Sequence, residues 1–211
     1  LAMVPPFMSR GSVFQMLHPP PPAPPQAAPP PRILAIRMLA DCAQGVAYLH
    51  ACTPPIIHRD LKSPNLLVAP DYSVKVADFG LARLQPGTTS RIGSVQWAAP
   101  EILLGKTYSH KCDAWSFGVV CWEMVTAQVP FEGISAQQVA AQVAMDGMRL
   151  PVPHGAPNRL LRLIARCWSE SPELRPEFDH VLVELQGIEH ELLARADAAV
   201  GVCVPRVVRA Q

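Results

Sequence analysis

Three side chains that could take part in a reaction lie close together in the stretch HRDLKSPN at residues 58–65. Asp60 contributes a carboxylate, Lys62 an ammonium group two residues later, and Asn65 an amide. Such groups can accept a proton, neutralise a negative charge and offer an oxygen ligand. A turn aspartate, a surface lysine and a capping asparagine would show the same letters, so the stretch needs support from elsewhere in the chain.

Three further motifs downstream supply that support. HRDLKSPN fits the pattern H-R-D-L-x-x-x-N of a protein-kinase catalytic loop. DFG follows at 78–80 after a strand-like run, AAPE at 98–101 and DAWSFG at 113–118. Four motifs in the right order and spacing make a chance match improbable. Apart from a proline-rich insert, residues 1–190 therefore resemble the C-terminal lobe of a eukaryotic protein kinase.

Two details of this resemblance indicate a subgroup. KSPN after HRDL, and the stretch GSVQWAAPE, are similar to the tyrosine-kinase-like group of serine/threonine kinases, with Raf-like and mixed-lineage relatives. Tyrosine kinases usually carry HRDLAARN or HRDLRAAN at this point. The resemblance implies a signalling transferase that moves the γ-phosphate of ATP, with Mg²⁺, to serine or threonine of protein substrates.

The resemblance also implies a role for each reactive residue. Because the transition state of phosphoryl transfer is loose, positioning and charge neutralisation dominate catalysis. Asp60 is expected to orient the substrate hydroxyl and accept its proton, and Lys62 to neutralise the γ-phosphate. Asn65 and Asp78 are expected to supply oxygen ligands for Mg²⁺. Leu67 matches the apolar residue that floors the adenine pocket.

Five other residues match architectural positions of the family. His58 is expected to bond the backbone and hold the loop rather than act as a base. Asp113 is expected to clamp the backbone of the catalytic loop. Glu101 and Arg175 match a buried ion pair, and Ser94 matches the residue that faces the substrate beside the catalytic-loop lysine.

The segment between DFG and APE holds candidate phosphorylation sites. Thr88, Thr89 and Ser90 are hydroxyl residues in this segment. Arg59, beside the catalytic aspartate, could pair with a phosphate there. For any single hydroxyl, an ordinary exposed polar loop is an equal alternative.

The segment at 1–14, LAMVPPFMSRGSVF, resembles the last N-lobe strand and the hinge of a kinase. The carbonyl of Pro6 and the N–H of Met8 match the hinge groups that contact adenine, while Pro5 would take the gatekeeper position, where proline is unusual. No GxG occurs in the chain, and the first lysine is Lys62. The Gly-rich loop and Lys–Glu pair of the other lobe are therefore missing, so we expect the chain alone to be inactive. The start without Met indicates a piece of a longer product.

The hydrophobic pattern predicts a mainly α fold with a small β component, and the resemblance implies that this fold is a kinase-like C-terminal lobe with a truncated N-lobe. Helix-like patterns cover 12–18, 33–50, 113–126, 134–145, 158–169 and 177–196, and strand-like runs cover 56–58, 66–69 and 74–78. The turn PDYS joins the last two runs as a hairpin. No clear periodicity continues after residue 197.

Together, these patterns and the resemblance divide the chain into four parts. Residues 1–17 are expected to hold the last N-lobe strand, the hinge and the first C-lobe helix. A proline-rich insert covers 18–31, the kinase C-terminal lobe covers 32–194, and a tail covers 195–211.

Composition argues against several classes of protein. With a formal net charge of +1 over 211 residues, the chain lacks the footprint of a nucleic-acid-binding protein. No apolar run reaches the roughly 18 residues that indicate a membrane span. The best candidate, at 114–125, is shorter and carries Glu123. Six cysteines without a CxxC pair predict reduced core thiols in a cytoplasmic protein, rather than a disulfide framework or a zinc site.

The stretch PPPPAPPQAAPPP at 19–31 is expected to form exposed polyproline II structure. An SH3 or WW domain is a candidate partner, although the Arg-flanked form PxxPxR fails because Ala27 stands where it needs proline. A tolerated loop insertion is the alternative for this segment.

A non-catalytic kinase-lobe scaffold with a proline-rich docking arm is the rival for the whole chain. The intact residues Asp60, Asn65 and Asp78 argue against the scaffold, and the missing lobe argues for it. An upstream GxGxxG and VAIK-like segment in frame would decide for the enzyme.

Overall fold

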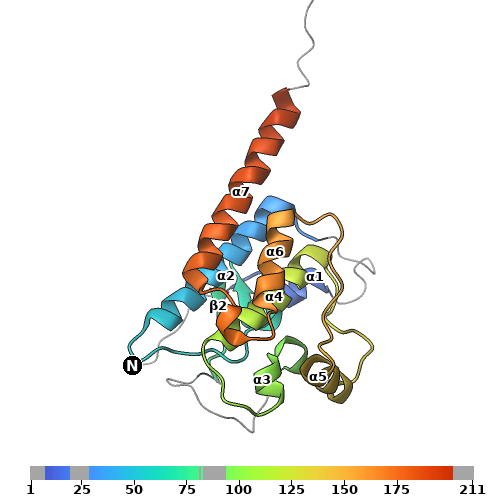
Figure 1. Cartoon of the computed structure of the whole chain (residues 1–211). Coiled ribbons are helices and arrows are strands. Elements are labelled where there is room, and N and C mark those ends of the chain that lie inside the picture. Colours follow the sequence, from blue (N-terminus) through green and yellow to red (C-terminus); the bar gives the residue numbers. More distant parts are fainter. Residues whose placement is uncertain (1–7, 20–28, 81, 83–93, 202–211) are drawn as a thin grey trace, which may run out of the picture.

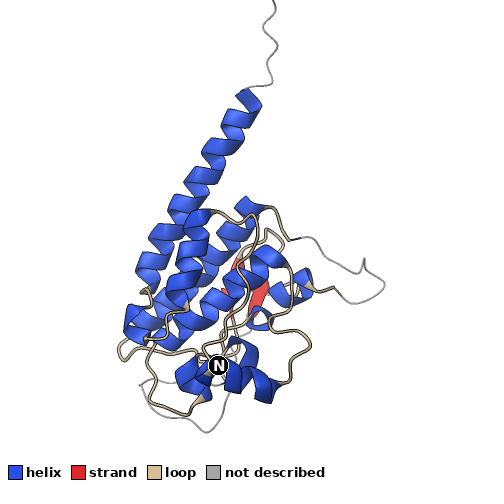
Figure 2. Ribbon diagram, turned by 45° about the vertical axis from the view of Figure 1, so that its right-hand side comes forward, coloured by secondary structure: helices blue, strands red, loops and turns tan. Residues whose placement is uncertain are grey.

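The computed structural model describes residues 8–19, 29–80, 82 and 94–201, except for the side chains of 199–201. Within these ranges the chain is mainly helical and contains one two-stranded sheet (Figures 1 and 2). The elements are α1 (Val13–Leu17), α2 (Arg32–Ala51), β1 (Leu66–Val68), β2 (Val74–Val76), α3 (Pro100–Leu103), α4 (Lys111–Thr126), α5 (Ala136–Met145), α6 (Asn158–Cys167) and α7 (Phe178–Gly201). Short 3-10 helices cover Ser63–Asn65, Val95–Trp97 and Pro172–Leu174.

Helix α4 forms the centre of the core. Every residue from Cys112 to Met124 is buried, as expected for a helix that is apolar nearly all round. Helices α2 and α6 pack against α4, and α7 packs along α2. In Figure 1, α7 runs beside α2 and then projects beyond the rest of the body.

The two strands form an antiparallel hairpin that lies against α2. Leu66 pairs with Val76, and Val68 pairs with Val74. The carboxylate of Asp41 on α2 accepts a hydrogen bond from the N–H of Val74 at 2.9 Å. The hairpin is therefore fixed to the helix at the start of β2.

The segment before α1 lies along the free edge of β1. The N–H of Arg10 donates to the carbonyl of Val68 at 3.3 Å, and the N–H of Val68 donates to the carbonyl of Gly11 at 2.8 Å. Ser12 then begins α1 through a capping box with Gln15. This arrangement places the residues that follow Met8 beside β1.

The predicted helices are confirmed, and the structure differs from the predicted elements in three places. The strand predicted at 56–58 is wrong, because only Ile57 makes an isolated bridge, and the amides of His58 and Arg59 bond to a carboxylate instead of a strand. Helix α7 continues to Gly201 instead of losing periodicity at 197, since the alanine-rich end favours helix. The four-residue helix α3 is too short to show a period and was not predicted.

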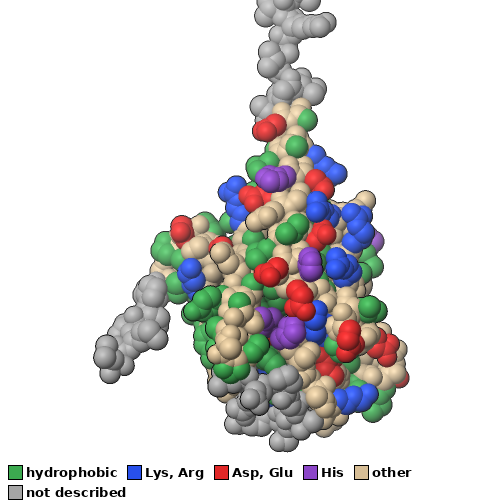
Figure 3. Space-filling model, turned by 60° about the vertical axis from the view of Figure 1, so that its left-hand side comes forward, with side chains coloured by type: hydrophobic (Ala, Val, Ile, Leu, Met, Phe, Trp, Pro, Cys, Tyr) green, Lys and Arg blue, Asp and Glu red, His purple; other side chains and the backbone are tan. Residues whose placement is uncertain are grey.

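Charged side chains of both signs are interspersed over the face shown in Figure 3. Several charges lie in ion pairs between α7 and its neighbours, including Arg37–Glu189 and Arg159–Glu184, both at 2.6 Å. In the part of the chain that the structure describes, no helix is both long and apolar enough to cross a membrane.

Candidate catalytic site

The buried carboxylate of Asp113, on α4, holds the start of the HRDLKSPN loop. Its Oδ2 accepts a hydrogen bond from the N–H of His58 at 2.9 Å, and its Oδ1 accepts one from the N–H of Arg59 at 2.9 Å. His50 on α2 lies 2.8 Å from Oδ2. Burial by itself raises the pKa of Asp113, but the bond and charge of His50 and the two amide donors lower it overall. The predicted backbone clamp is therefore confirmed.

The ring of His58 joins the loop to the end of β2. Its Nδ1 accepts a hydrogen bond from the N–H of Asp60 at 3.3 Å, and its Nε2 lies 3.1 Å from the carbonyl oxygen of Ala77. Because an amide N–H can only donate and a carbonyl can only accept, the ring proton is assigned to Nε2. His58 thus bonds the backbone, as predicted.

Asp60, Lys62 and Ser94 meet at the centre of the site. The Nζ of Lys62 lies 2.7 Å from Oδ2 of Asp60 and 2.8 Å from the hydroxyl of Ser94. The N–H of Ser94 donates to Oδ1 of Asp60 at 3.1 Å. The side chains of Asp60 and Lys62 are only 10% and 16% exposed, so their charges face each other with little water between them.

Asn65 lies next to this group. Its Nδ2 donates to the carbonyl of Asp60 at 2.9 Å and lies 3.3 Å from Oδ2 of that residue. The short 3-10 helix Ser63–Asn65 brings the amide back toward Asp60. With the amide nitrogen turned to Asp60, the amide oxygen Oδ1 is left for a cation.

Asp78 comes directly after Ala77, whose N–H and carbonyl are both hydrogen-bonded. The N–H of Ala77 donates to the carbonyl of Asn65 at 2.9 Å, and the carbonyl of Ala77 accepts from His58. Asp78 has a left-handed backbone, with φ of 62°, and its Oδ1 accepts from the N–H of Gly80 at 3.2 Å. The next side chain, Phe79, is 49% exposed and its ring lies 5.4 Å from that of His58.

The donor set at Asn65 and Asp78 fits a hard cation. Amide and carboxylate oxygens suit Mg²⁺, which keeps several waters and takes few protein ligands. Among the described residues, no group of three or more His, Cys, Asp and Glu side chains is arranged to hold a metal. A cation here would therefore complete its shell with water or with oxygens of a bound molecule.

The residues predicted to contact adenine are only partly described. Leu67 lies in β1, where its backbone forms a bridge with Ser12. The carbonyl of Met8 accepts from the N–H of Gly11 at 3.1 Å, within the turn that leads to this bridge. Pro6 and the preceding residues lie outside the described ranges, as do Thr88, Thr89 and Ser90.

The predicted ion pair of Glu101 and Arg175 is confirmed. Two hydrogen bonds join the guanidinium to the carboxylate, and the Arg175 side chain is fully buried. Arg175 also donates to the carbonyls of Ser169 and Lys111 at 3.0 and 3.2 Å. This pair joins the start of α3 to the start of α4 and to the loop before α7.

Sequence reasoning missed the part played by Glu123. This residue was used only to exclude a membrane span, yet its carboxylate is buried on α4 and takes hydrogen bonds from His18, Ser63 and Trp97. Burial raises the pKa of Glu123, and the hydrogen bonds of Ser63, His18 and Trp97 lower it in part. The available signal was an acidic residue inside an otherwise apolar run, since a buried carboxylate requires partners.

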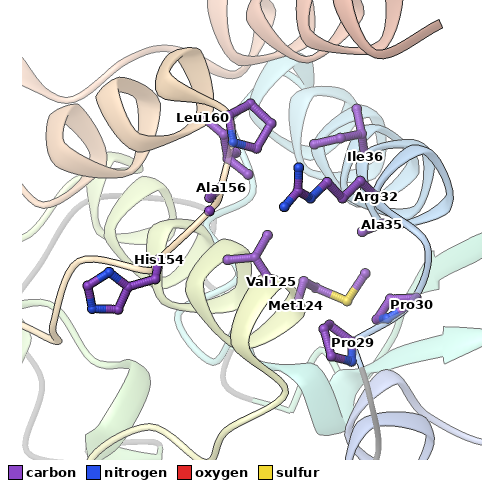
Figure 4. A pocket seen from close by; sticks show the side chains of 12 residues that line it. Pro29, Pro30, Arg32, Ala35, Ile36, Met124, Val125, His154, Ala156 and Leu160 are labelled. Carbon is purple, nitrogen blue, oxygen red and sulfur yellow. The ribbon is translucent and has the colours of Figure 1, made fainter. Parts of the chain in front are cut away.

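A cavity of about 170 Å³ lies between α2, the end of α4 and the start of α6 (Figure 4). Its lining includes Arg32, Ile36, Met124 and Leu160. None of the predicted site residues is among the residues that line it. The candidate catalytic site is the group around Asp60, and this cavity is separate from it.

Comparison with known proteins identifies similar sequences. Residues 1–185 match the profile of a family described as protein tyrosine and serine/threonine kinase. Probable serine/threonine-protein kinase SIS8 of Arabidopsis thaliana is 37% identical over 193 residues, which are 90% of the chain and 18% of that protein. Probable serine/threonine-protein kinase drkA of Dictyostelium discoideum is 41% identical over 87% of the chain and 28% of its own length. Serine/threonine-protein kinase CTR1 of Arabidopsis thaliana is 40% identical over 86% of the chain and 22% of its own length. The chain therefore spans less than a third of each of these relatives.

Proposed function

Because the chain belongs to the protein tyrosine and serine/threonine kinase family, we propose that it is the catalytic-loop part of an ATP-dependent kinase that phosphorylates serine or threonine of proteins. The names of the relatives support serine and threonine as acceptors. The mainly helical structure and the family match confirm the fold class predicted from the sequence. The observation that carries the proposal is the meeting of Asp60, Lys62 and Ser94 within hydrogen-bonding distance.

Asp60 is proposed to orient the substrate hydroxyl and accept its proton. Its carboxylate is held in place, because the Nζ of Lys62 and the N–H of Ser94 bond its two oxygens. A positioned proton acceptor accelerates such a transfer by about 10²–10⁴-fold. Lys62 is proposed to neutralise charge on the γ-phosphate, since its ammonium group lies beside the same carboxylate.

Asn65 and Asp78 are proposed to hold Mg²⁺, which would neutralise charge on the phosphates of ATP. Their oxygens are of the kind this cation prefers. The hydrogen bonds from Ala77 to Asn65 and from His58 to Ala77 fix the position of Asp78 relative to Asn65. Leu67, Met8 and Pro6 are proposed to contact adenine, since the segment after Met8 lies along β1.

We infer the same four parts of the chain as the sequence indicates, with the C-terminal lobe at 32–194 between a proline-rich insert at 18–31 and a tail at 195–211. Protein substrates are the proposed partners, with an SH3 or WW domain as a further candidate for the insert. The cysteines of the described ranges are free thiols, and four of the five are buried, which supports a reducing, cytoplasmic compartment.

The test needs both lobes, because the phosphates are also held by a Gly-rich loop and a Lys–Glu pair. We would fuse the segment that precedes the matched region of drkA to the first residue of this chain and measure phosphate transfer to a generic serine/threonine substrate. Asp60→Asn is expected to lower turnover by about 10²–10⁴-fold without changing nucleotide affinity. Asp78→Asn is expected to impair both Mg-ATP binding and turnover, because it weakens the charge on the metal ligand.

Asp71→Asn is the matched control for these two variants. Asp71 lies in the hairpin turn, where it bonds the N–H of Ser73 at 3.0 Å, and an asparagine can make the same bond. Turnover of this variant should equal that of the unmodified fusion. Unchanged turnover of Asp60→Asn in an active fusion would overturn the proposal.

A further inference from the structure

Glu123 is the point where three distant segments meet on α4. Its side chain is fully buried. Oε1 accepts a hydrogen bond from the hydroxyl of Ser63 at 2.6 Å and lies 3.1 Å from Nε2 of His18. Oε2 accepts from the indole N–H of Trp97 at 3.2 Å. The three partners belong to the HRDLKSPN loop, to the end of α1 and to the 3-10 helix before α3.

Two of these partners, Ser63 and Trp97, belong to the segments that carry Lys62 and Ser94 of the candidate site. Ser63 follows Lys62 in the chain, so its position fixes the backbone from which the ammonium group extends. Trp97 ends the 3-10 helix whose N-cap is Ser94, and the N–H of Trp97 donates to the Ser94 carbonyl at 3.1 Å. Glu123 thus bonds both of the segments that carry Lys62 and Ser94, whose side chains meet at 2.8 Å.

The indole N–H of Trp97 can only donate, so the side chain at position 123 must present an acceptor to it. A carboxylate also accepts from the hydroxyl of Ser63 on its other oxygen. A glutamine that keeps its oxygen on Trp97 turns its NH₂ group toward Ser63 instead. Glu123→Gln therefore keeps the size of the side chain and removes the acceptor of the Ser63 hydroxyl.

A second residue of α4 also bonds Trp97, so both the backbone and the side chain of Trp97 are fixed. The hydroxyl of Ser116 donates to the carbonyl of Trp97 at 2.8 Å. The indole bond to Glu123 therefore sets the side chain of Trp97, while Ser116 sets its backbone. On the other side, Ser63 is fully buried, so its short hydroxyl has little freedom to find another partner.

We propose that Glu123 is a positioning residue for phosphate transfer, which sets Lys62 and Ser94 against Asp60 through its bonds to Ser63 and Trp97. This inference rests on the proposed function, since it concerns how the same site is held. It differs from a purely structural role, because loss of either bond should disturb the site even where the fold is intact.

The first arm of the test uses the 211-residue chain without nucleotide. We would record ¹H–¹⁵N spectra of Ser63→Ala, Trp97→Phe and Glu123→Gln, with Glu132→Gln as a control on an exposed glutamate. In each of the first three variants, the amide resonance of Ser94 should move, because its N–H bonds Asp60 only when the segments are in register. The control should leave it unchanged. An unmoved Ser94 amide in all three folded variants would overturn the inference.

The second arm uses the fusion with the drkA segment. Ser63→Ala and Trp97→Phe are each expected to lower kcat by about 10- to 100-fold, the cost of a small misplacement of reacting groups, and to leave KM for ATP unchanged. The double variant Ser63→Ala/Glu123→Gln should lose less than the product of the two single losses, because both remove the same connection.

The two arms separate the inference from the function on which it rests. If the unmodified fusion transfers no phosphate, the proposed function fails, and the Ser94 amide still decides whether Glu123 sets the site. If the fusion is active, and if Ser63→Ala, Trp97→Phe and Glu123→Gln all leave kcat and the melting temperature unchanged, the positioning role is wrong.

Discussion

Arg175 and Glu101 are joined by two hydrogen bonds, of 2.6 Å from Nη1 to Oε1 and 2.9 Å from Nη2 to Oε2. The fork of the guanidinium matches the two oxygens of the carboxylate, which is the strongest form of a charged hydrogen bond. Both residues are buried, and they are separated by 74 positions in the chain. The pair therefore connects parts of the fold that lie far apart in the sequence.

Arg175→Ala should lower the free energy of unfolding by about 3–5 kcal/mol, because it leaves the Glu101 carboxylate buried without its partner. Urea unfolding of the 211-residue chain measures the change. Arg159→Ala is the matched control, since Arg159 pairs with Glu184 on the surface, and this variant should change stability little. Equal losses from both variants would contradict the buried pair as the source of the effect.

The pH dependence of stability should include a contribution from Asp113. The pKa of this carboxyl is lowered in the folded protein, so its stabilising effect is complete above its ordinary pKa of about 3.9 and is lost as pH falls through the lower folded value. Asp113→Asn lacks this titration. The difference in unfolding free energy between wild type and this variant should therefore narrow as the pH falls below about 4 toward the lower folded pKa.

Urea unfolding at several pH values measures this difference, with Asp197→Asn as a control on the exposed part of α7. The control should show no narrowing. A constant gap for Asp113→Asn across the range would mean that the folded carboxyl has an ordinary pKa.

Gly118 of α4 lies against Cys167 and Trp168 at the end of α6. A Cβ at this position would lie 2.7 Å from Nε1 of Trp168 and 2.8 Å from Cβ of Cys167. Overpacking costs about 1–3 kcal/mol, which exceeds the gain of about 1 kcal/mol in helix propensity from glycine to alanine. Gly118→Ala should thus lower the free energy of unfolding. Gly187→Ala on α7 should not, because its Cβ would meet only the end of the Arg159 side chain, which can move.

Thermal and urea unfolding of the two glycine variants provide the comparison. If alanine stabilises the protein equally at both positions, the contact between α4 and α6 is looser than the structure shows.

The 211-residue chain should bind Mg-ATP weakly. Leu67, Asn65 and Asp78 are the residues proposed to contact adenine and metal, but the chain contains no GxG and no lysine before Lys62 to hold the phosphates. Isothermal titration calorimetry should detect no binding tighter than about 1 mM, which corresponds to roughly 4 kcal/mol. The fusion with the drkA segment should bind more tightly. Micromolar binding by the chain alone would show that these missing groups are not needed.

The meeting of the side chains of the HRDLKSPN loop could be predicted from the sequence, because its residues are close together in the chain and their spacing is distinctive. Asp60, Lys62 and Asn65 lie within six positions, and their side chains meet in the structure. Helices α2 and α4 were also predicted, since twenty and sixteen residues show a clear hydrophobic pattern. Such signals are local, so they can be recognised in a single sequence without knowledge of distant contacts.

The contacts of Glu123 could not be predicted in the same way. Its partners lie 26, 60 and 105 positions away, and no local period relates them. The pairing of Glu101 with Arg175 is equally distant and was predicted only from the resemblance to a family. The strand predicted at 56–58 failed for a related reason, because the distant Asp113 takes the amides of His58 and Arg59.

The supports of the catalytic loop also bear on the order of events during synthesis. Ser94, Asp113 and Glu123 bond the loop from 34, 55 and 60 positions further along the chain. A ribosome that has just completed HRDLKSPN has therefore made the reactive residues but none of these three supports. The bonds from α4 can hold the loop in its observed shape only after α4 has left the ribosome, so a nascent chain that stops before Lys111 should expose this loop to proteases.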